Sequence, residues 1–213
     1  KRPMPAGEMA KLHSLVASNS ADWRSFMIER ASSAVCCGVS IWLETGMILP
    51  LGYWVLDSAC QQLAAWSRNP ATAHWTLAVN VSAAQLAQPG FVESVKKALL
   101  HSQAPATQLK LELTESMLAN DVEGIITKMM DIKALGVNFS LDDFGTGYSS
   151  LGYLKHLPLD QLKIDASFVR DVLTDPNDAT IARVIITLAS ELQLSVIAEG
   201  VETQAQRDFL AAN

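Results

Sequence analysis

The hydrophobic pattern of the chain becomes regular at Glu44, after which short apolar runs alternate with longer segments of helical periodicity. Short runs predict strands, and apolar positions that recur every three or four residues predict helices. The expected strands are 75–79, 109–113, 137–141, 161–164 and 194–198, and the expected helices are 51–66, 91–100, 122–135, 178–192 and one from Thr203. This alternation is typical of right-handed βαβ units in a parallel sheet. The fold class is therefore α/β, and the alternation allows either a doubly wound sheet or a closed barrel.

Residues 1–43 show no comparable pattern. The stretch 31–40 mixes small, polar and apolar residues without the period of a strand or of a helix. We therefore divide the chain into an atypical N-terminal segment, 1–43, and a regularly patterned domain, 44–213.

Composition limits the kind of protein. With 213 residues, 49% of them hydrophobic and 18% charged, the chain can bury one large core, and its strands are expected to be covered on both faces. Apolar runs are too short for a transmembrane helix, and the stretch from Lys1 to Pro5 lacks the apolar core of a signal peptide. We expect a cytoplasmic protein.

Charge and cysteine content narrow the function further. A formal net charge of −6 argues against nonspecific binding to a nucleic acid polymer or to a membrane surface. A metal ion could still bring a small phosphorylated anion to an acidic pocket. Cys36, Cys37 and Cys60 have no metal-ligand spacing and are expected to be reduced thiols.

Polar residues cluster at one end of the expected strands. The residues at or just beyond the carboxyl ends of five different strands are Asn80, Glu112, Asp142 with Asp143, Lys163 and Glu199. In a closed parallel barrel these ends meet at one mouth, where the chemistry of such barrels is found. The pattern favours a TIM-like (β/α)8 barrel over the open sheet, incomplete or remodelled at both ends of the chain.

The adjacent carboxylates of Asp142 and Asp143 need a cation or hydrogen-bond donors, because like charges raise each other's pKa. A divalent-metal site explains the pair, and an Asp–Asp helix cap is the alternative. Oxygen ligands from Asn, Glu and Asp, without His or Cys, suit Mg²⁺ or Mn²⁺ better than zinc. Two such ions would activate a water and neutralise a phosphoryl oxygen.

Lys163 would place a positive charge beside a phosphate or the attacking water. Its ammonium is costly to bury unless carboxylates pair with it, and the candidate partners are Asp142, Asp143 and Asp165. The alternative is a lysine on an edge strand whose ammonium reaches solvent.

Structural roles are open for the remaining polar residues. Glu112 could be a solvated carboxylate at a strand end, and Glu115 could belong to a capping box that begins near Thr114. The residues expected to pack or cap rather than react are Tyr148, Ser149 and Ser150.

Five motifs, in this order and spacing, resemble the EAL-domain family of cyclic di-GMP phosphodiesterases. They are Val79–Leu86 (VNVSAAQL), Glu112–Ser116 (ELTES), Asp142–Ser150 (DDFGTGYSS), Leu162–Asp165 (LKID) and Ala198–Thr203 (AEGVET). The match runs from Glu44 to Asn213. The resemblance implies a TIM-like barrel with an antiparallel first strand that hydrolyses cyclic di-GMP to linear pGpG with Mg²⁺ or Mn²⁺.

The resemblance also implies roles for individual residues. By position, Asn80, Glu112 and Asp142 look like ligands of the first metal, and Asp143 looks like a ligand of the second. Lys163 matches the lysine that contacts the water or the phosphate.

Further positions are carried over in the same way. Glu199 matches a carboxylate beside the metals that is proposed as general base. Glu115 and Glu202 match residues that support the loop after the Asp–Asp strand and the substrate pocket, and Asp165 is a supporting residue of the LKID motif. In many relatives that loop and the adjoining helix form a dimer contact, which implies a homodimer.

The chain also departs from the family pattern. The Glu-Ala-Leu motif, whose Glu is a metal ligand and whose nearby Arg contacts the substrate phosphate, is not recognisable in 1–43. The chain stops at Asn213, before the expected final strand and its Gln, and Ala166 stands where the family has Arg after Leu-Lys-Ile-Asp. An unclosed barrel would expose two sheet edges.

A shifted reading frame would account for the N-terminal segment. Back-translation of Ala31–Ile41 with permitted codons, read two bases later, gives a run that resembles the missing Glu-Ala-Leu-Leu-Arg-Trp-Gln-His. The alternatives are a naturally remodelled N-terminus and residues lost from the chain, and sequencing the encoding DNA distinguishes them.

Two functions follow from these observations. The five strand-end positions predict a cyclic di-GMP phosphodiesterase of bacterial second-messenger signalling. The missing Glu and Gln allow a degenerate EAL domain that binds cyclic di-GMP or a protein partner without catalysis. A sensory or GGDEF domain is expected upstream in a full-length relative.

Overall fold

The computed structural model describes residues 47–119, 121–145 and 151–213, and the chain divides into two compact units, Lys1–Leu51 and Gly52–Asn213. Of the first unit, only the turn from Met47 to Leu51 that begins helix α4 is described. The fold and the site below belong to the second unit. The expectations for 1–43 and for Tyr148, Ser149 and Ser150 fall outside the described residues.

Helices and strands alternate along the described chain. The longer elements are α4 (Ile48–Ser67), β1 (Leu77–Asn80), α6 (Phe91–Ser102), β2 (Leu109–Thr114), α7 (Val122–Lys133), β3 (Asn138–Phe144), β4 (Gln161–Ile164), α10 (Pro176–Glu191), β5 (Ser195–Ala198) and α11 (Gln204–Ala211). The short ones are α5 (Ala83–Ala87), α8 (Leu151–Leu154), α9 (Ala166–Arg170) and the 3₁₀ turns η1 (Ala106–Gln108) and η2 (Glu115–Ala119). Every strand and helix expected from periodicity is present, with ends that differ by a few residues.

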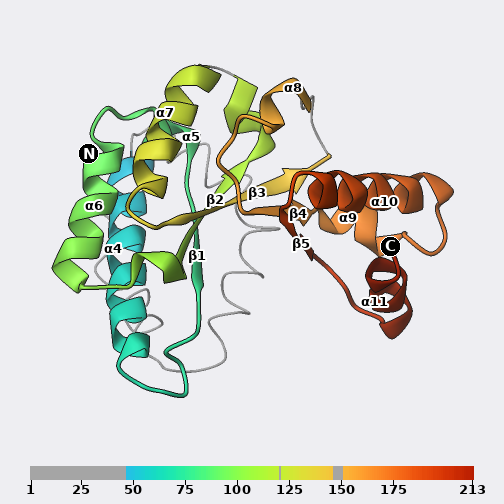
Figure 1. Ribbon diagram of the computed structural model, residues 1–213, viewed down its shortest axis with the longest axis horizontal. Helices are drawn as coiled ribbons and strands as arrows, with labels where there is room; N and C mark the ends of the chain where they lie inside the picture. Colours follow the sequence, from blue (N-terminus) through green and yellow to red (C-terminus); the bar gives the residue numbers. More distant parts are fainter. Residues whose placement is uncertain (1–46, 120, 146–150) are drawn as a thin grey trace. The chain divides into compact units, whose positions relative to one another are not determined.

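The five described strands form one parallel sheet in the order β1-β2-β3-β4-β5 (Figure 1). Each strand pairs with the next strand in sequence, so the order never reverses. A right-handed crossover after every strand then places each connecting helix on the same face of the sheet. This is the winding of a barrel, because a doubly wound sheet needs a point where the strand order reverses.

The apolar face of the sheet forms the core with the helices. Strand residues of this face that are fully buried include Leu111, Phe139, Leu141 and Leu162. One continuous cluster joins them to buried residues of the helices, among them Leu63 (α4), Val95 (α6), Met129 (α7) and Ile185 (α10). The opposite face of the strands carries the polar residues, so the side chains alternate between core and site along the strands.

Two further observations concern the expectations for the cysteines and for a transmembrane helix. Cys60 is a buried free thiol, and burial, together with the charge of Asp57, raises its pKa to about 12. No helix in the described parts of the chain has the length and apolarity needed to cross a bilayer.

Periodicity missed α5 and α9 because each is too short to show a helical repeat. Both begin at residues that cap helices. The hydroxyl of Ser82 accepts a hydrogen bond from the Gln85 N–H, and the carboxylate of Asp165 accepts one from the Ser167 N–H. These two helices start directly after β1 and β4, and they therefore hold the ends of strands that carry polar site residues.

Gly52 of α4 makes room for the buried amide of Gln85. A Cβ built on Gly52 would lie 2.2 Å from the amide carbon of Gln85, whose Oε1 accepts hydrogen bonds from the N–H and the hydroxyl of Ser82. Alanine normally stabilises a helix interior relative to glycine. We expect Gly52→Ala instead to destabilise this protein by about 1–3 kcal/mol, because the methyl group overpacks the site. The midpoint of urea unfolding measures the change.

A double-mutant cycle is the control for the Gly52 prediction. In a Gln85→Ala background the obstructing amide is gone, and Gly52→Ala should then be neutral or stabilising. A raised unfolding midpoint for Gly52→Ala in the parent protein would show that the amide moves aside without cost.

Candidate functional site

The candidate site is centred on the ammonium of Lys163. Lys163 lies on β4, between β3 and β5, and is 8% exposed. Its Nζ lies 2.5 Å from Oε1 of Glu199, 3.0 Å from Oδ1 of Asp142 and 3.3 Å from Oε2 of Glu112. The alternative of a lysine on an edge strand is therefore wrong for this sheet. The site gathers side chains from the ends of four neighbouring strands.

The three carboxylates keep Lys163 charged. Burial opposes the charge on its ammonium, but the hydrogen bond to Glu199 and the negative charges of Glu112 and Asp142 outweigh burial, so the pKa of Lys163 lies above its ordinary value. A lysine in this state can stabilise negative charge but cannot act as a base near neutral pH.

The same environment disfavours the charged form of Glu112, although it favours the charged form of Lys163. Burial raises the pKa of its carboxyl, and the positive charge of Lys163 offsets that effect only in part because Asp142 and Glu199 add negative charge nearby. The Glu112 side chain is 12% exposed, so the alternative of a solvated strand-end carboxylate is wrong. An additional cation beside Glu112 would relieve this repulsion.

Asp142 and Asp143 are part of β3, which extends beyond the expected strand end at residue 141. The strand continues to Phe144, and its pairing with β4 shifts register between Leu141 and Phe144. Asp143 has φ 55°, the left-handed region that non-glycine residues rarely adopt. The helix-cap alternative is wrong for this pair, because a β-bulge carries both carboxylates.

The bulge explains how adjacent residues can serve one site. Successive strand residues normally point to opposite faces of a sheet, whereas here Asp142 and Asp143 together oppose the stretch of β4 that contains Lys163. Burial raises the pKa of Asp143 most, and the charges of Asp142, Asp165 and Glu199 raise it further. Asp143 therefore lies within electrostatic reach of the same cluster.

Asn80 also lies at the carboxyl end of its strand, as the other site residues do. It is the last residue of β1, and its Cα pairs in register with that of Glu112 on β2. Its side chain is exposed. Asn80 thus lies beside Glu112 on the outer side of the cluster, while Lys163 lies two strands further on, on β4.

The supporting residues have distinct contacts. Glu115 is 6% exposed, and its Oε2 accepts a hydrogen bond of 3.1 Å from the N–H of Gly145 at the end of β3. Its carboxylate thus binds the end of β3 instead of completing a capping box. Asp165 caps α9, and Glu202 has an exposed side chain and donates its backbone N–H to the side chain of Gln206.

Other polar residues near the site were not predicted. Gln206 joins two segments that follow β4 and β5, and the spacing Thr203-x-x-Gln206 is a capping-box signal that could have revealed it. Deeper on the polar face, Nζ of Lys110 donates a 2.7 Å hydrogen bond to Oε1 of Gln161. The alternation of β2 places Lys110 on the face of Glu112 and was the available signal for it.

The donor set of the site is chemically suited to a hard divalent cation. The side chains at the strand ends offer carboxylate and amide oxygens, the ligands that Mg²⁺ and Mn²⁺ prefer. Within the described ranges, no three His, Cys, Asp or Glu side chains are arranged so that they could hold a metal ion. In this arrangement three carboxylates contact the ammonium of Lys163, which supplies the neutralising charge.

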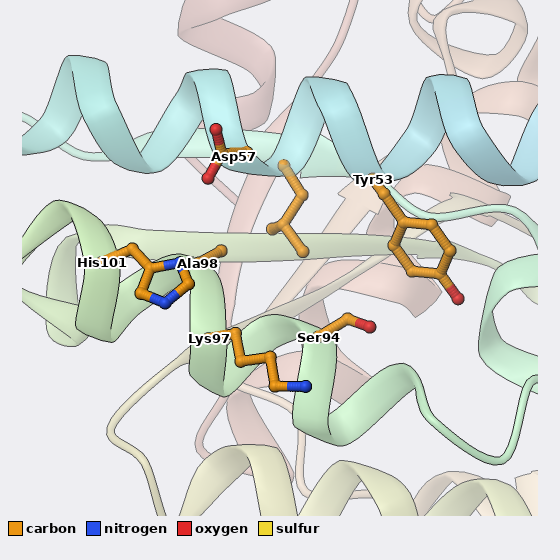
Figure 2. Close-up of a pocket in the computed structure, with 7 residues that line it drawn as sticks. Tyr53, Asp57, Ser94, Lys97, Ala98 and His101 are labelled. Atoms are coloured by element: carbon orange, nitrogen blue, oxygen red, sulfur yellow. The ribbon is translucent and has the colours of Figure 1, made fainter.

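A separate small pocket lies away from the strand ends, between α4 and α6 (Figure 2). Its volume is about 200 Å³. The labelled residues that line it are Tyr53, Asp57, Ser94, Lys97, Ala98 and His101. It contains none of the residues that the sequence predicts for catalysis or metal binding, so the strand-end cluster remains the candidate site.

Consecutive parallel strands with a carboxylate–lysine cluster at their carboxyl ends define an α/β barrel domain with its polar site at the strand ends. The chain matches the family model of the EAL domain over residues 6–213 and belongs to that family. This confirms the resemblance read from the motifs. It also confirms the expected TIM-like fold, of which the described residues supply five strands.

Known proteins similar to this chain include cyclic di-GMP enzymes. The bifunctional diguanylate cyclase/cyclic di-GMP phosphodiesterase MucR of Pseudomonas aeruginosa is 46% identical over 167 residues, which are 78% of this chain and 24% of MucR. A solved structure described as the PaMucR phosphodiesterase in complex with c-di-GMP is 44% identical, with a TM-score of 0.77 over 82% of this chain and 70% of that one. This chain thus spans about a quarter of the length of MucR.

A more distant structure contains a metal ion. The calcium and cyclic di-GMP complex of Klebsiella pneumoniae BlrP1 is 27% identical, with a TM-score of 0.64 over 74% of this chain and 40% of that one. That structure thus contains a divalent cation together with the nucleotide.

Proposed function

We propose that this chain is a metal-dependent phosphodiesterase that hydrolyses cyclic di-GMP to linear pGpG. The observation that carries the proposal is the cluster in which Lys163 contacts the carboxylates of Glu112, Asp142 and Glu199 at the ends of adjacent strands. Membership of the EAL family and the similarity to MucR support the choice of substrate.

The metal-binding role falls to oxygen ligands around the cluster. Asn80, Glu112 and Asp142 would hold a first Mg²⁺ or Mn²⁺, and Asp143 would hold a second. When bound, the ions supply Lewis-acid activation of the attacking water and neutralise a phosphoryl oxygen. The burial-raised pKa values of Glu112 and Asp143 fit this role, because a cation favours the ionised form of both.

The remaining chemistry belongs to Lys163 and Glu199. The Lys163 ammonium stabilises the negative charge that develops on the phosphoryl group. Glu199 accepts the proton of the attacking water, the new P–O bond forms, and the ester bond to one ribose oxygen breaks. That oxygen takes up a proton, which leaves a linear dinucleotide with a terminal phosphate. Glu115, Glu202 and Asp165 support the loops around this centre.

The proposal extends to the cellular role of the chain and to its division into domains. The chain acts in bacterial second-messenger signalling in the cytoplasm as a homodimer. All of its proposed site residues lie in 44–213, which we propose as the barrel domain, and 1–43 forms an atypical segment. An upstream sensory or GGDEF domain would control the activity in the full-length protein.

Turnover of cyclic di-GMP tests the proposed function directly. We expect conversion to pGpG by this chain with Mg²⁺ or Mn²⁺, and no conversion after removal of divalent ions with a chelator. Chromatographic separation of the two nucleotides measures the product, with Ca²⁺ as a comparison ion. Absence of turnover at saturating Mn²⁺, with Lys163→Ala indistinguishable from the parent, would contradict the proposal.

Calorimetry distinguishes the alternative of a degenerate domain. Heat on addition of cyclic di-GMP without turnover would identify a receptor of the nucleotide. No heat with either the metal ions or the nucleotide would contradict both hydrolysis and binding of cyclic di-GMP, and would leave only a domain that binds a protein partner.

A further inference from the structure

Gln206, in the first turn of α11, forms a buried link between two segments near the site. Gln206 is 6% exposed. Its Oε1 accepts hydrogen bonds of 2.9 Å from the N–H groups of Glu202 and Thr203. Its Nε2 donates to the carbonyl oxygens of Val169, at 3.3 Å, and Arg170, at 3.2 Å. The amide thus uses both its acceptor and its donors in the interior, where an unmade hydrogen bond is costly.

The two linked segments lie just beyond the two residues that perform the proposed chemistry, Lys163 and Glu199. Val169 and Arg170 end α9, which follows β4 and its Lys163. Glu202 and Thr203 end the loop 199–203, which follows β5 and begins with Glu199. Gln206 therefore connects the chain beyond Lys163 with the chain beyond Glu199.

The rest of this loop is held at its other end. The N–H of Glu199 donates a 3.0 Å hydrogen bond to the carbonyl of Ile164 on β4. Gly200 has φ 67°, and a Cβ built on it would lie 2.8 Å from the Cβ of Ala166, so the loop packs directly on the start of α9. Loop 199–203 is thus held on α9 at two places. Gly200 contacts the start of the helix, and the Gln206 amide binds its end.

A second capping box in the same chain shows what is unusual about Gln206. Gln85 occupies the same position of its box in α5 and is equally buried. The hydrogen bonds described for the Gln85 side chain stay within its own cap, to Ser82. A capping box alone therefore does not require the donations from Gln206 to α9, which link loop 199–203 to that helix.

We infer that Gln206 is a positioning residue for the proposed phosphodiesterase reaction and holds Glu199 in contact with Lys163. The inference rests on the proposed function. Glu199 lies on a loop and its side chain is 38% exposed, so its place beside the buried ammonium depends on the loop backbone. Loss of the Gln206 amide lets loop 199–203 move relative to α9. A displacement of about 1 Å at a reacting group lowers a rate by roughly a hundredfold.

The test compares Gln206→Met with a control substitution at the opposite ends of the strands. Methionine matches the volume of glutamine but removes all four hydrogen bonds. The control, Asp160→Asn, weakens the ion pair to Lys133 at the amino ends of the strands, while the amide oxygen can still accept from the N–H of Phe139. Urea unfolding, kcat and KM for cyclic di-GMP, and hydrogen exchange of the amides of 199–203 are measured for each protein.

We expect kcat of Gln206→Met to fall by about tenfold to a hundredfold, with a smaller change in KM, and the amides of 199–203 to exchange faster. Asp160→Asn should unfold at lower urea with parental kcat and parental exchange in this loop. Gln206→Glu keeps the acceptor for Glu202 and Thr203 but places an oxygen against the carbonyls of Val169 and Arg170, so it should loosen the loop at least as much as Gln206→Met. It also carries the test if Gln206→Met does not fold.

Each outcome decides the inference. Parental kcat in Gln206→Met, or an equal loss in Asp160→Asn, would overturn it. If the parent itself does not turn over cyclic di-GMP, the proposed function fails and the exchange rates decide the positioning role by themselves. In that case, unchanged exchange of 199–203 in Gln206→Met would overturn it as well.

Discussion

Replacing Lys163 with methionine is expected to lower turnover of cyclic di-GMP by at least about a hundredfold. The ammonium lies in a largely buried site within 3.3 Å of three carboxylates, where a fixed positive charge acts more strongly than in water. Methionine has a similar length and no charge, so it removes the electrostatic contribution with little change in volume. Steady-state kcat and KM, at saturating Mn²⁺, measure the effect.

Lys110→Met is the matched control for this substitution. Lys110 lies on the same face of the sheet, and its Nζ donates to the neutral side chain of Gln161. We expect Lys110→Met to affect stability with little change in turnover. Equal turnover in Lys163→Met and the parent would remove Lys163 from the mechanism.

The same Lys163 substitution should destabilise the metal-free protein by about 3 kcal/mol at neutral pH, because Glu112 and Asp142 lose their cation. The pKa values of Glu112 and Asp143 are raised in the folded state, so these groups contribute stability that is fully present below their ordinary values of 4.5 and 3.8. That contribution is lost as the pH rises through the folded pKa values. The destabilisation should therefore shrink as the pH falls from 7 and the carboxyls protonate, which urea unfolding across this range measures.

Asp142→Asn is expected to weaken binding of Mn²⁺ by at least about a hundredfold. The change removes one negative charge from the proposed first metal site, and asparagine keeps an oxygen that can accept from Lys163 at the position of Oδ1. Titration calorimetry measures the affinity. In the parent, Mn²⁺ at one hundred times its Kd should stabilise the fold by about 2.7 kcal/mol, and the same concentration should have little effect on Asp142→Asn.

Asp131→Asn provides the comparison for metal binding. Asp131 is an exposed carboxylate on α7, so its replacement removes the same charge from the molecule without touching the strand ends. It should bind Mn²⁺ like the parent. An unchanged Mn²⁺ affinity in Asp142→Asn would place the cation elsewhere on the protein.

The strand-end residues could be predicted because strands and their polar ends leave a local pattern. Buried runs that end in Asn80, Glu112 or Lys163 are visible in a few residues of sequence. The parallel, sequential order of the strands then brings those ends together, as the 3.3 Å contact between Lys163 and Glu112 shows. The motif resemblance pointed to the same residues independently.

Other parts of the site could not be predicted, because they depend on pairing between strands. The register shift between β3 and β4 makes Asp142 and Asp143 a bulge within a strand, and it depends on the positions of both chains. The hydrogen bonds from Gln206 to α9 span 36 and 37 residues, and only the folded chain brings these groups within reach.

The amino-acid sequence by itself determined the α/β alternation, the strands and the residue types at their ends, because these follow from local periodicity and motif. The tertiary structure alone decided that the sheet winds in one direction and that Lys163 lies inside the sheet among three carboxylates. It also decided that Gln206 connects helix α9, beyond Lys163, with the loop beyond Glu199. The physical reason is that pairing, burial and charge contacts join residues distant in sequence, and their energies depend on geometry that no local pattern contains.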